Sequence, residues 1–241
     1  MDSIKMNAAD TRMVAHRGLS GIEPENTLAS FIAAGNRSYY GIETDVHRTA
    51  DGKFVVVHDD DTLRVSGENL PVEGTDFDTL RALALKTESG ETRVDLHIPT
   101  LKEYIATCRR YDKVAVLELK NEFSAEDIKK ICDEINDLDY LPNVIFISFS
   151  FINLVYIREL YPTQTVQFLT NTYAEDLLQI LQVHKFDVDI LYTELNPERI
   201  RAFHDHGIKV NCWTCDDKEF GEMLAGAGID FISSNILEGE A

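Results

Sequence analysis

The sequence predicts an α/β protein, a (β/α)8 barrel of the TIM type. Short apolar runs of strand length alternate with segments of helical periodicity along the chain. Strands that alternate with helices pair in parallel, and eight such units close a TIM barrel. A doubly wound open sheet is the alternative, but its glycine-rich fingerprint is absent after the first strand. The eight strand candidates are residues 13–18, 41–46, 113–120, 144–150, 165–170, 188–194, 209–215 and 230–235.

The segments between these strands carry helix signals. Apolar residues that recur three and four positions apart form one face of a helix. The three clearest sets are Leu28, Phe31, Ile32 and Gly35; Ile128, Ile131, Cys132 and Ile135; and Phe220, Met223, Leu224 and Ala227. Residues that favour helix N-termini stand at Asn26-Thr27, at Ser124 and at Asn196-Pro197.

The whole chain, residues 1–241, is expected to form one barrel domain with an insertion. Residues 60–99 are polar, contain turn signals and follow the strand FVVVHD that leads to His58. An insertion at this side of a barrel would lie beside the mouth of the active site. The last predicted strand is followed by only six residues, so the eighth helix is missing or is supplied by another segment.

The net charge of the chain argues against some classes of ligand. The net charge of −19 repels nucleic acids and anionic membrane surfaces, which leaves a small molecule as the expected partner. No apolar run approaches the roughly 18 residues of a membrane span, and the first residues contain no apolar signal segment. We therefore expect a cytoplasmic protein, with a removed export signal as the open alternative. The oligomeric state is not indicated by the sequence.

Cys212 and Cys215 match the C-x-x-C pattern but do not indicate redox chemistry. They lie in a strand-like run, whereas a redox C-x-x-C stands at the start of a helix. Four cysteines in 241 residues are also too few for a disulfide scaffold. We interpret the two as unrelated residues.

Acidic side chains gather at the carboxyl ends of the predicted strands. Side chains alternate between the two faces of a strand, so Glu43, Asp45 and His47 share one face. By the same alternation Glu118 points into the barrel from the next strand of the predicted barrel, while His47 lies further out, at the rim. Crowded carboxylates require a cation to offset their repulsion. Carboxylates without thiolate or imidazole ligands suit one hard divalent ion, Mg²⁺ or Ca²⁺.

Basic and aromatic residues fall at the same rim. His16 and Arg17 follow the first strand, and Lys120 ends the strand of Glu118. Two histidines, His16 and His58, can divide general acid and general base work, and the two cations can hold a phosphate oxygen. Strand alternation places Trp213 at the mouth as a substrate wall or as core packing, with the Cys215 thiol beside it.

Six short motifs in order resemble the glycerophosphodiester phosphodiesterase family, over nearly the whole chain. They are His16-Arg17-Gly18, Pro24-Glu25-Asn26-Thr27, Glu43-x-Asp45-Val46, Val57-His58-Asp59, Ile98-Pro99-Thr100-Leu101 and Leu117-Glu118-Leu119-Lys120. One departure follows the last strand, where the family commonly has an Asp and a Pro and this chain has Ser233-Ser234-Asn235-Ile236.

The resemblance implies a TIM barrel and the metal-dependent hydrolysis of glycerophosphodiesters, such as glycerophosphocholine or glycerophosphoethanolamine, to glycerol 3-phosphate and an alcohol. It implies Glu43, Asp45 and Glu118 as metal ligands and His16 and His58 as the acid–base pair. Arg17 and Lys120 match positions that contact phosphate. The attacking hydroxyl is water or the glycerol 2-hydroxyl.

Two other functions remain open. A lysophospholipase D or sphingomyelinase D would act on lipid phosphodiesters, and a barrel without turnover would only bind a phosphodiester. The pair His204 and His206 is not expected to bind metal, because residues two apart on a helix do not face each other. Asn26-Thr27 is interpreted only as a helix cap.

Overall fold

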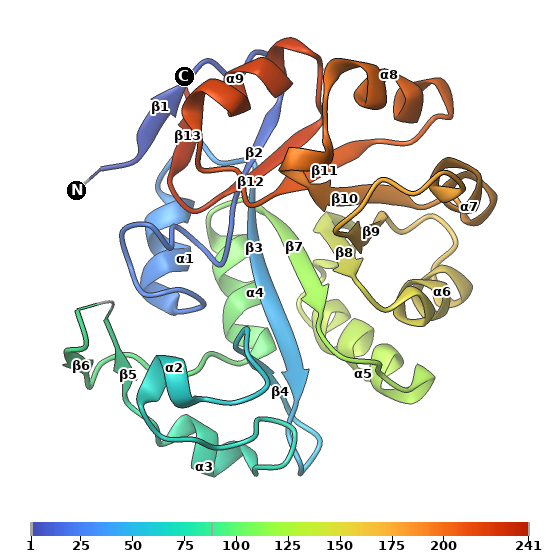
Figure 1. Cartoon of the computed structure of the whole chain (residues 1–241). Helices are drawn as coiled ribbons and strands as arrows, with labels where there is room; N and C mark the ends of the chain where they lie inside the picture. Colours follow the sequence, from blue (N-terminus) through green and yellow to red (C-terminus); the bar gives the residue numbers. More distant parts are fainter. Residues whose placement is uncertain (1, 88, 241) are drawn as a thin grey trace.

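The computed structural model describes residues 2–87 and 89–240, and its centre is a nearly closed parallel barrel (Figure 1). Within this part of the chain, neighbouring strands of the barrel follow the order β11, β10, β9, β8, β7, β3, β2, β12. Two backbone hydrogen bonds, from Asp230 N to Val210 O and from Cys215 N to Ser233 O, bring the two end strands together. The barrel strands are β2 (Arg12–Ala15), β3 (Gly41–Arg48), β7 (Val114–Leu119), β8 (Val144–Ser148), β9 (Val166–Thr170), β10 (Asp187–Leu191), β11 (Val210–Trp213) and β12 (Phe231–Ser234). The predicted barrel is confirmed.

Helices surround the barrel, and their starts follow the capping signals of the sequence. Thr27, Thr100, Ser124 and Asn196 each accept a hydrogen bond from a backbone amide of the first turn of α1, α4, α5 and α8. The predicted face of α5 is confirmed, since all four of its apolar residues are buried. The outer helices are α1 (Leu28–Gly35), α4 (Leu101–Arg110), α5 (Ala125–Asn136), α6 (Phe151–Leu160), α7 (Leu177–His184), α8 (Pro197–Asp205) and α9 (Lys218–Gly226), with 3-10 turns η1 (Leu141–Asn143) and η2 (Tyr192–Glu194).

The core has two layers, one inside the barrel and one between strands and helices. Val116 on β7 packs inside with Ile145, Ile147 and Leu169, whereas Leu117 packs outward against the helices. The predicted alternation of β7 is therefore confirmed. It leaves the inner face free to carry Glu118 at the carboxyl end of the strand.

The described residues of the polar segment 60–99 lie beside the carboxyl ends of β3 and β7, where Asn121 contacts Asp60 and Glu73; this segment is cyan to green in Figure 1. A separate apolar cluster that includes Val57, Val72, Leu80 and Ile98 holds it together. Its elements, with the β4 strand that leads into it, are β4 (Phe54–Val56), α2 (Leu63–Ser66), α3 (Phe77–Arg81), β5 (Leu85–Lys86) and β6 (Thr92–Arg93).

Several predicted strands are too long. The strand predicted for 13–18 ends at Ala15, and the strand predicted for 188–194 ends at Leu191, where η2 begins. The strand predicted for 209–215 ends at Trp213, two residues early, so the alternation of strand faces cannot be applied to Cys215. Cys215 is buried in the outer core and does not line the mouth. In each case the prediction included residues of the turn or loop that follows the last paired residue of the strand.

The residues after β12 form a strand. β13 (Leu237–Gly239) pairs in parallel with β1 (Ile4–Met6), so the last described segment lies beside the first (Figure 1). No helix in residues 2–87 and 89–240 is both long and apolar enough to cross a membrane.

Candidate active site

Three carboxylates converge at the carboxyl ends of β3 and β7. Asp45 is directly opposite Glu118 in the parallel register, and Glu43 lies two residues earlier on the same face. One oxygen of each carboxylate lies within 4.8 Å of the others, and all three side chains are buried. This is the group that the sequence predicts as metal ligands.

Burial and mutual repulsion shift the protonation of this cluster. Burial, Asp45 and Glu118 raise the pKa of Glu43 well above its usual range. Burial and Asp45 raise the pKa of Glu118 to about 7. Burial alone would raise the pKa of Asp45, but Lys120 and Arg17 outweigh it and hold this pKa below its ordinary value. The cluster therefore has a shortage of positive charge.

The donor set fits a hard divalent cation. Lys120 Nζ lies 2.9 Å from Glu118 Oε1 and 3.3 Å from Asp45 Oδ1, yet neither oxygen has a well-formed hydrogen bond within the described ranges. Buried carboxylate oxygens without such partners are costly. A cation with oxygen ligands, Mg²⁺ or Ca²⁺, would satisfy both.

His16 and Arg17 reach the cluster from a turn after β2. Arg17 and Gly18 both have positive φ angles, and a Cβ at Gly18 would lie 2.7 Å from the backbone of Ser30. Only glycine fits this approach. The turn lets Arg17 N donate to Glu43 Oε2 at 2.8 Å and leaves its guanidinium 3.0 Å from Glu25 and 3.7 Å from Asp45.

His16 is held by a neutral partner. Its Nδ1 lies 2.8 Å from Asn235 Oδ1, and its Nε2 lies 3.9 Å from Glu43 Oε2. Burial, with Arg17 nearby, lowers the pKa of His16 to about 4. Asn235 belongs to the segment after β12 in which the sequence departs from the family pattern, so the departure supplies the group that orients this histidine.

His58 arrives from the β3–β4 hairpin. β4 pairs antiparallel with β3, and Val57 N donates to Asp45 O, which returns the chain to the acidic cluster one residue before His58. His58 Nδ1 lies 2.7 Å from Asp59 Oδ1. Burial is the main cause that lowers the pKa of His58, partly opposed by the Asp45 carboxylate.

The insertion braces this histidine through Arg64, which sequence reasoning missed. The Arg64 guanidinium lies 2.7 Å from Asp59 Oδ2 and 2.7 Å from Glu25 Oε2. It therefore joins the partner of His58 to the partner of Arg17. The sequence gives little indication of this role, because a single arginine in a polar loop cannot be distinguished from an ordinary solvent-exposed arginine.

Two predictions about neighbouring residues were wrong. His47 does not lie at an exposed rim: the insertion covers it completely, and its ring lies 3.3 Å from both Glu73 Oε1 and the carbonyl of His58. Asn26 does not cap α1, because Thr27 does. Asn26 is buried and donates to Asp45 Oδ2 at 2.7 Å.

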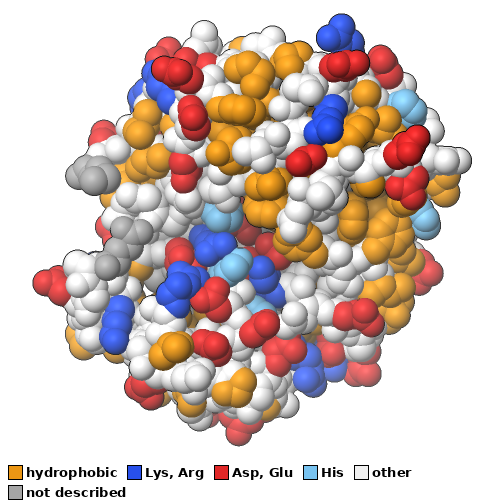
Figure 2. Space-filling model, viewed as in Figure 1, with side chains coloured by type: hydrophobic (Ala, Val, Ile, Leu, Met, Phe, Trp, Pro, Cys, Tyr) orange, Lys and Arg blue, Asp and Glu red, His pale blue; other side chains and the backbone are white. Residues whose placement is uncertain are grey.

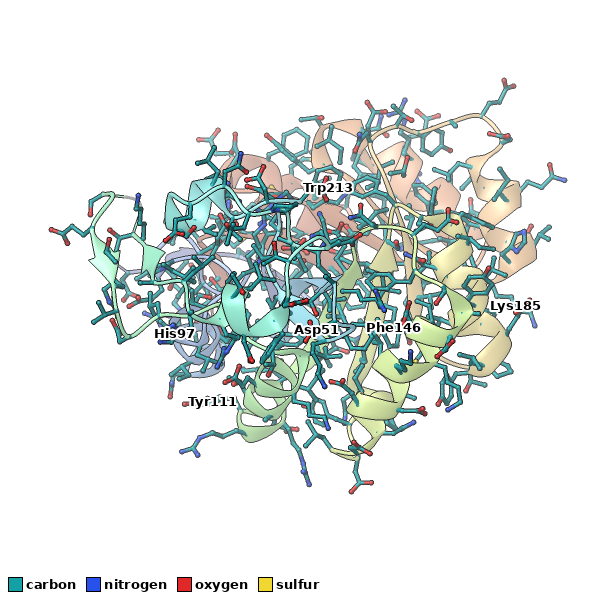
Figure 3. All side chains as sticks on the ribbon, turned by 90° about the horizontal axis from the view of Figure 1, so that it is seen from below. Asp51, His97, Tyr111, Phe146, Lys185 and Trp213 are labelled. Carbon is teal, nitrogen blue, oxygen red and sulfur yellow. The ribbon has the colours of Figure 1, made fainter. Side chains whose placement is uncertain are left out.

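Most of the predicted site residues line one cavity of about 100 Å³, among them Glu43 and Glu118 of the acidic cluster. His16, Arg17, His58 and Lys120 line one side, and Phe149, Leu169, Asp189 and Trp213 line the other. Figure 2 shows basic, acidic and histidine side chains gathered in a hollow at the centre of this face. In Figure 3 the Trp213 side chain lies toward the middle of the molecule, whereas Lys185 lies at its edge.

The remaining histidine pair lies away from this cavity. His204 Nε2 contacts Asp230 at 2.8 Å, and His206 Nδ1 contacts the carbonyl of Ala202 at the end of α8. The two rings have separate partners and share none. The structure does not bring them together with the acidic cluster.

The mouth of this TIM barrel combines buried carboxylates, two histidines and the cationic side chains of Arg17 and Lys120. This combination defines the chain as a phosphoric diester hydrolase. Residues 16–237 match the model of the glycerophosphoryl diester phosphodiesterase family, and the chain belongs to that family. It is thus an enzyme with glycerophosphodiester phosphodiesterase activity.

Individual relatives agree with this assignment. A glycerophosphodiester phosphodiesterase of Caldanaerobacter subterraneus is 28% identical over 92% of this chain and 93% of its own length. A phosphodiesterase of Oleispira antarctica, solved with the product sn-glycerol-3-phosphate, is 26% identical with a TM-score of 0.85 over 93% of each chain. A glycerophosphodiester phosphodiesterase of Parabacteroides distasonis is 26% identical with a TM-score of 0.79 over 96% of this chain and 94% of its own.

Proposed function

We propose that the enzyme hydrolyses glycerophosphodiesters with small headgroups, such as glycerophosphocholine and glycerophosphoethanolamine, to glycerol 3-phosphate and an alcohol. The observation that carries the proposal is a group of three buried carboxylates beside one cavity, which is lined by two of them, by two histidines and by the cationic side chains of Arg17 and Lys120. The product bound to the Oleispira antarctica relative, sn-glycerol-3-phosphate, supports the same substrate class.

Glu43, Asp45 and Glu118 would hold one divalent cation, Mg²⁺ or Ca²⁺. When bound, such a cation polarises a phosphoryl oxygen and lowers the pKa of an attacking hydroxyl. Arg17 and Lys120 supply fixed positive charge for the other phosphate oxygens, as guanidinium and ammonium groups do at phosphate sites. Both also pair with Asp45, so they remain in place before the substrate arrives.

The two histidines differ in ways that suit different roles. His16 has a neutral amide partner and a neighbouring guanidinium, so its neutral form is favoured, and we assign it as the general base. His58 has a carboxylate partner, Asp59, which partly offsets the lowering of its pKa by burial, a contribution that His16 lacks, and we assign His58 as the general acid that protonates the leaving alcohol. The attacking hydroxyl comes from water or from the glycerol 2-position.

The proposal is tested by glycerol 3-phosphate release from both substrates with Mg²⁺, with Ca²⁺ and with EDTA. Release that EDTA abolishes is the expected result. Glu118→Gln should lower both metal affinity and turnover by at least about 100-fold, since even an outer partner of a metal ligand contributes 10- to 100-fold.

The fold should survive this change because burial already favours an uncharged group at position 118. Glu122→Gln, the same change at an exposed position four residues on, is the matched control and should behave as the unaltered enzyme. Turnover in EDTA-treated, metal-free protein, or full activity of Glu118→Gln, would contradict the proposal.

A further inference from the structure

We infer that Asp189, on the far wall of the cavity, binds the terminal hydroxyl of the glycerol arm and so selects substrates whose glycerol end carries no acyl chain. This inference rests on the proposed function, because it assigns one arm of the same substrate. Asp189 lies on β10, across the barrel from the acidic cluster of β3 and β7. It lines the cavity yet is only 1% exposed, so it marks the closed end.

Buried amides hold Asp189 in position. Asn211 Nδ2 donates to Asp189 Oδ2 at 3.1 Å and to Gln167 Oε1 at 3.1 Å, and Ser233 Oγ lies 3.4 Å from Asn211 Oδ1. These residues come from four neighbouring strands, and all are buried. The carboxyl group is therefore fixed by a built polar layer and is not a loose side chain at an edge.

One oxygen of Asp189 is left over. Among residues 2–87 and 89–240, Asp189 Oδ1 has no hydrogen-bond partner. Buried polar atoms of native proteins are nearly always paired. Because the Asp189 residue lines the cavity, a ligand hydroxyl at this wall could supply the missing partner.

The chemistry of that group follows from the charge state of Asp189. Burial, together with the Glu118 carboxylate, raises the pKa of Asp189 well above its ordinary range, so the neutral acid predominates. A neutral carboxyl group both donates and accepts one hydrogen bond, and so does an alcohol hydroxyl. An ammonium headgroup offers donors only, and the neutral acid suits it less well.

The rest of the wall suits a short carbon chain. Leu169 and Trp213 line the cavity beside Asp189, and the Trp213 ring packs edge-on against Phe149 with centroids 5.6 Å apart. Apolar walls accommodate the methylene groups, and the polar end accommodates the hydroxyl. In a lysolipid an ester would replace this hydroxyl, and an ester cannot donate to Asp189.

The test compares glycerophosphocholine with its analogue that lacks the terminal hydroxyl, propane-1,2-diol phosphocholine. The unaltered enzyme should prefer glycerophosphocholine by about 100-fold in kcat/KM, since the analogue leaves a buried polar group unpaired. Asp189→Leu should reduce this preference to less than about fivefold, by losing activity on glycerophosphocholine and keeping activity on the analogue. Asp189→Asn should restore part of the preference, and a rise in KM larger than the fall in kcat would indicate a binding role.

Asp187→Asn is the matched control, because Asp187 lies on the same strand but bonds to the backbone of Lys209. It should leave the preference unchanged. An unchanged preference in both Asp189 variants would overturn the inference while leaving the proposed function intact. A shift in the ratio of glycerophosphoethanolamine to glycerophosphocholine, without a change toward the analogue, would overturn it in favour of an ammonium site.

A binding measurement tests the role of Asp189 even if the enzyme does not hydrolyse either substrate. If the unaltered enzyme hydrolyses neither substrate, the proposed function fails, and calorimetry of glycerol 3-phosphate against propane-1,2-diol phosphate tests the cavity wall alone. Tighter binding of glycerol 3-phosphate, lost in Asp189→Leu and partly kept in Asp189→Asn, would support the hydroxyl site. Equal binding of the two would overturn it.

Discussion

Asn26 couples the backbone of one loop to a candidate metal ligand, and replacing it with alanine should cost both stability and activity. Its Nδ2 donates to Asp45 Oδ2 at 2.7 Å, and its Oδ1 accepts from Thr44 Oγ1 at 2.7 Å. All three residues are buried. The backbone of Asn26 has φ of 52°, in the left-handed region that asparagine tolerates better than alanine.

These contacts set the size of the effect. A hydrogen bond to a charged group contributes about 1.5–3 kcal/mol, and a buried hydroxyl left without its acceptor costs about 1–3 kcal/mol. A left-handed backbone at alanine costs about 1–2 kcal/mol. We therefore expect Asn26→Ala to lower the free energy of unfolding by about 4 kcal/mol, which is roughly 8–16 °C in Tm for a chain of this size. Activity should fall as well, because Asp45 loses the donor that fixes its carboxylate.

Urea unfolding of metal-free protein measures the stability term. Asn26→Gly removes the same two hydrogen bonds but relaxes the backbone, so it should be about 1 kcal/mol more stable than Asn26→Ala. Asn36→Ala is the control, since the side chain of Asn36 is exposed and bonds only to Ile32 O, and it should change stability by less than about 1 kcal/mol. A loss below about 1 kcal/mol in Asn26→Ala would refute the reasoning.

Two further predictions concern the two catalytic histidines and Glu238 on β13. A glycerophosphodiester whose leaving group is p-nitrophenol needs no general acid, so His58→Ala should keep most of its turnover on this ester while His16→Ala should not; equal losses in steady-state rates would contradict the assignment. Burial alone would raise the pKa of Glu238, but Lys5 and neighbouring serine hydroxyls outweigh it and lower the pKa to about 2 from an ordinary value of 4.5. This lowered pKa gives stability that is present above pH 4.5 and is lost as the pH falls toward 2, by up to about 3 kcal/mol. The difference in urea stability between the unaltered protein and Glu238→Gln should therefore shrink by more than half between pH 7 and pH 3, and a constant difference would argue against the linkage.

The sequence was sufficient for residues whose position follows from strand geometry. Glu43, Asp45 and Glu118 stand at alternating positions near the ends of apolar strands, and parallel strands end at one edge, so their meeting could be predicted. Asn26 could not be recognised in the same way, because its neighbour Thr27 carries the same capping signal. Which of two adjacent polar residues caps a helix depends on the backbone angles of the turn.

Asp189 escaped notice for a different reason. In the run FDVDIL, residues 186–191, Asp187 and Asp189 are two positions apart, and alternation alone places both on one face of the strand. Only the barrel distinguishes them, since Asp187 lies at the amino-terminal end of β10 and bonds to the backbone of Lys209, whereas Asp189 lies deep inside. Arg64 was missed because its partners, Glu25 and Asp59, are brought together only by the folded insertion.

The place of β12 beside β2 has a consequence for how the enzyme matures. β12 completes the sheet by pairing with β2, and His16 takes its orienting contact from Asn235, 219 positions further along the chain. Contacts of such long sequence separation form late and slowly in folding, since the intervening loop must first be closed. On the ribosome, the helices and the earlier strands can assemble while synthesis continues, but His16 cannot be oriented until β12 and Asn235 have emerged. Catalytic competence should therefore appear as one of the last events of biogenesis, after most of the secondary structure is in place.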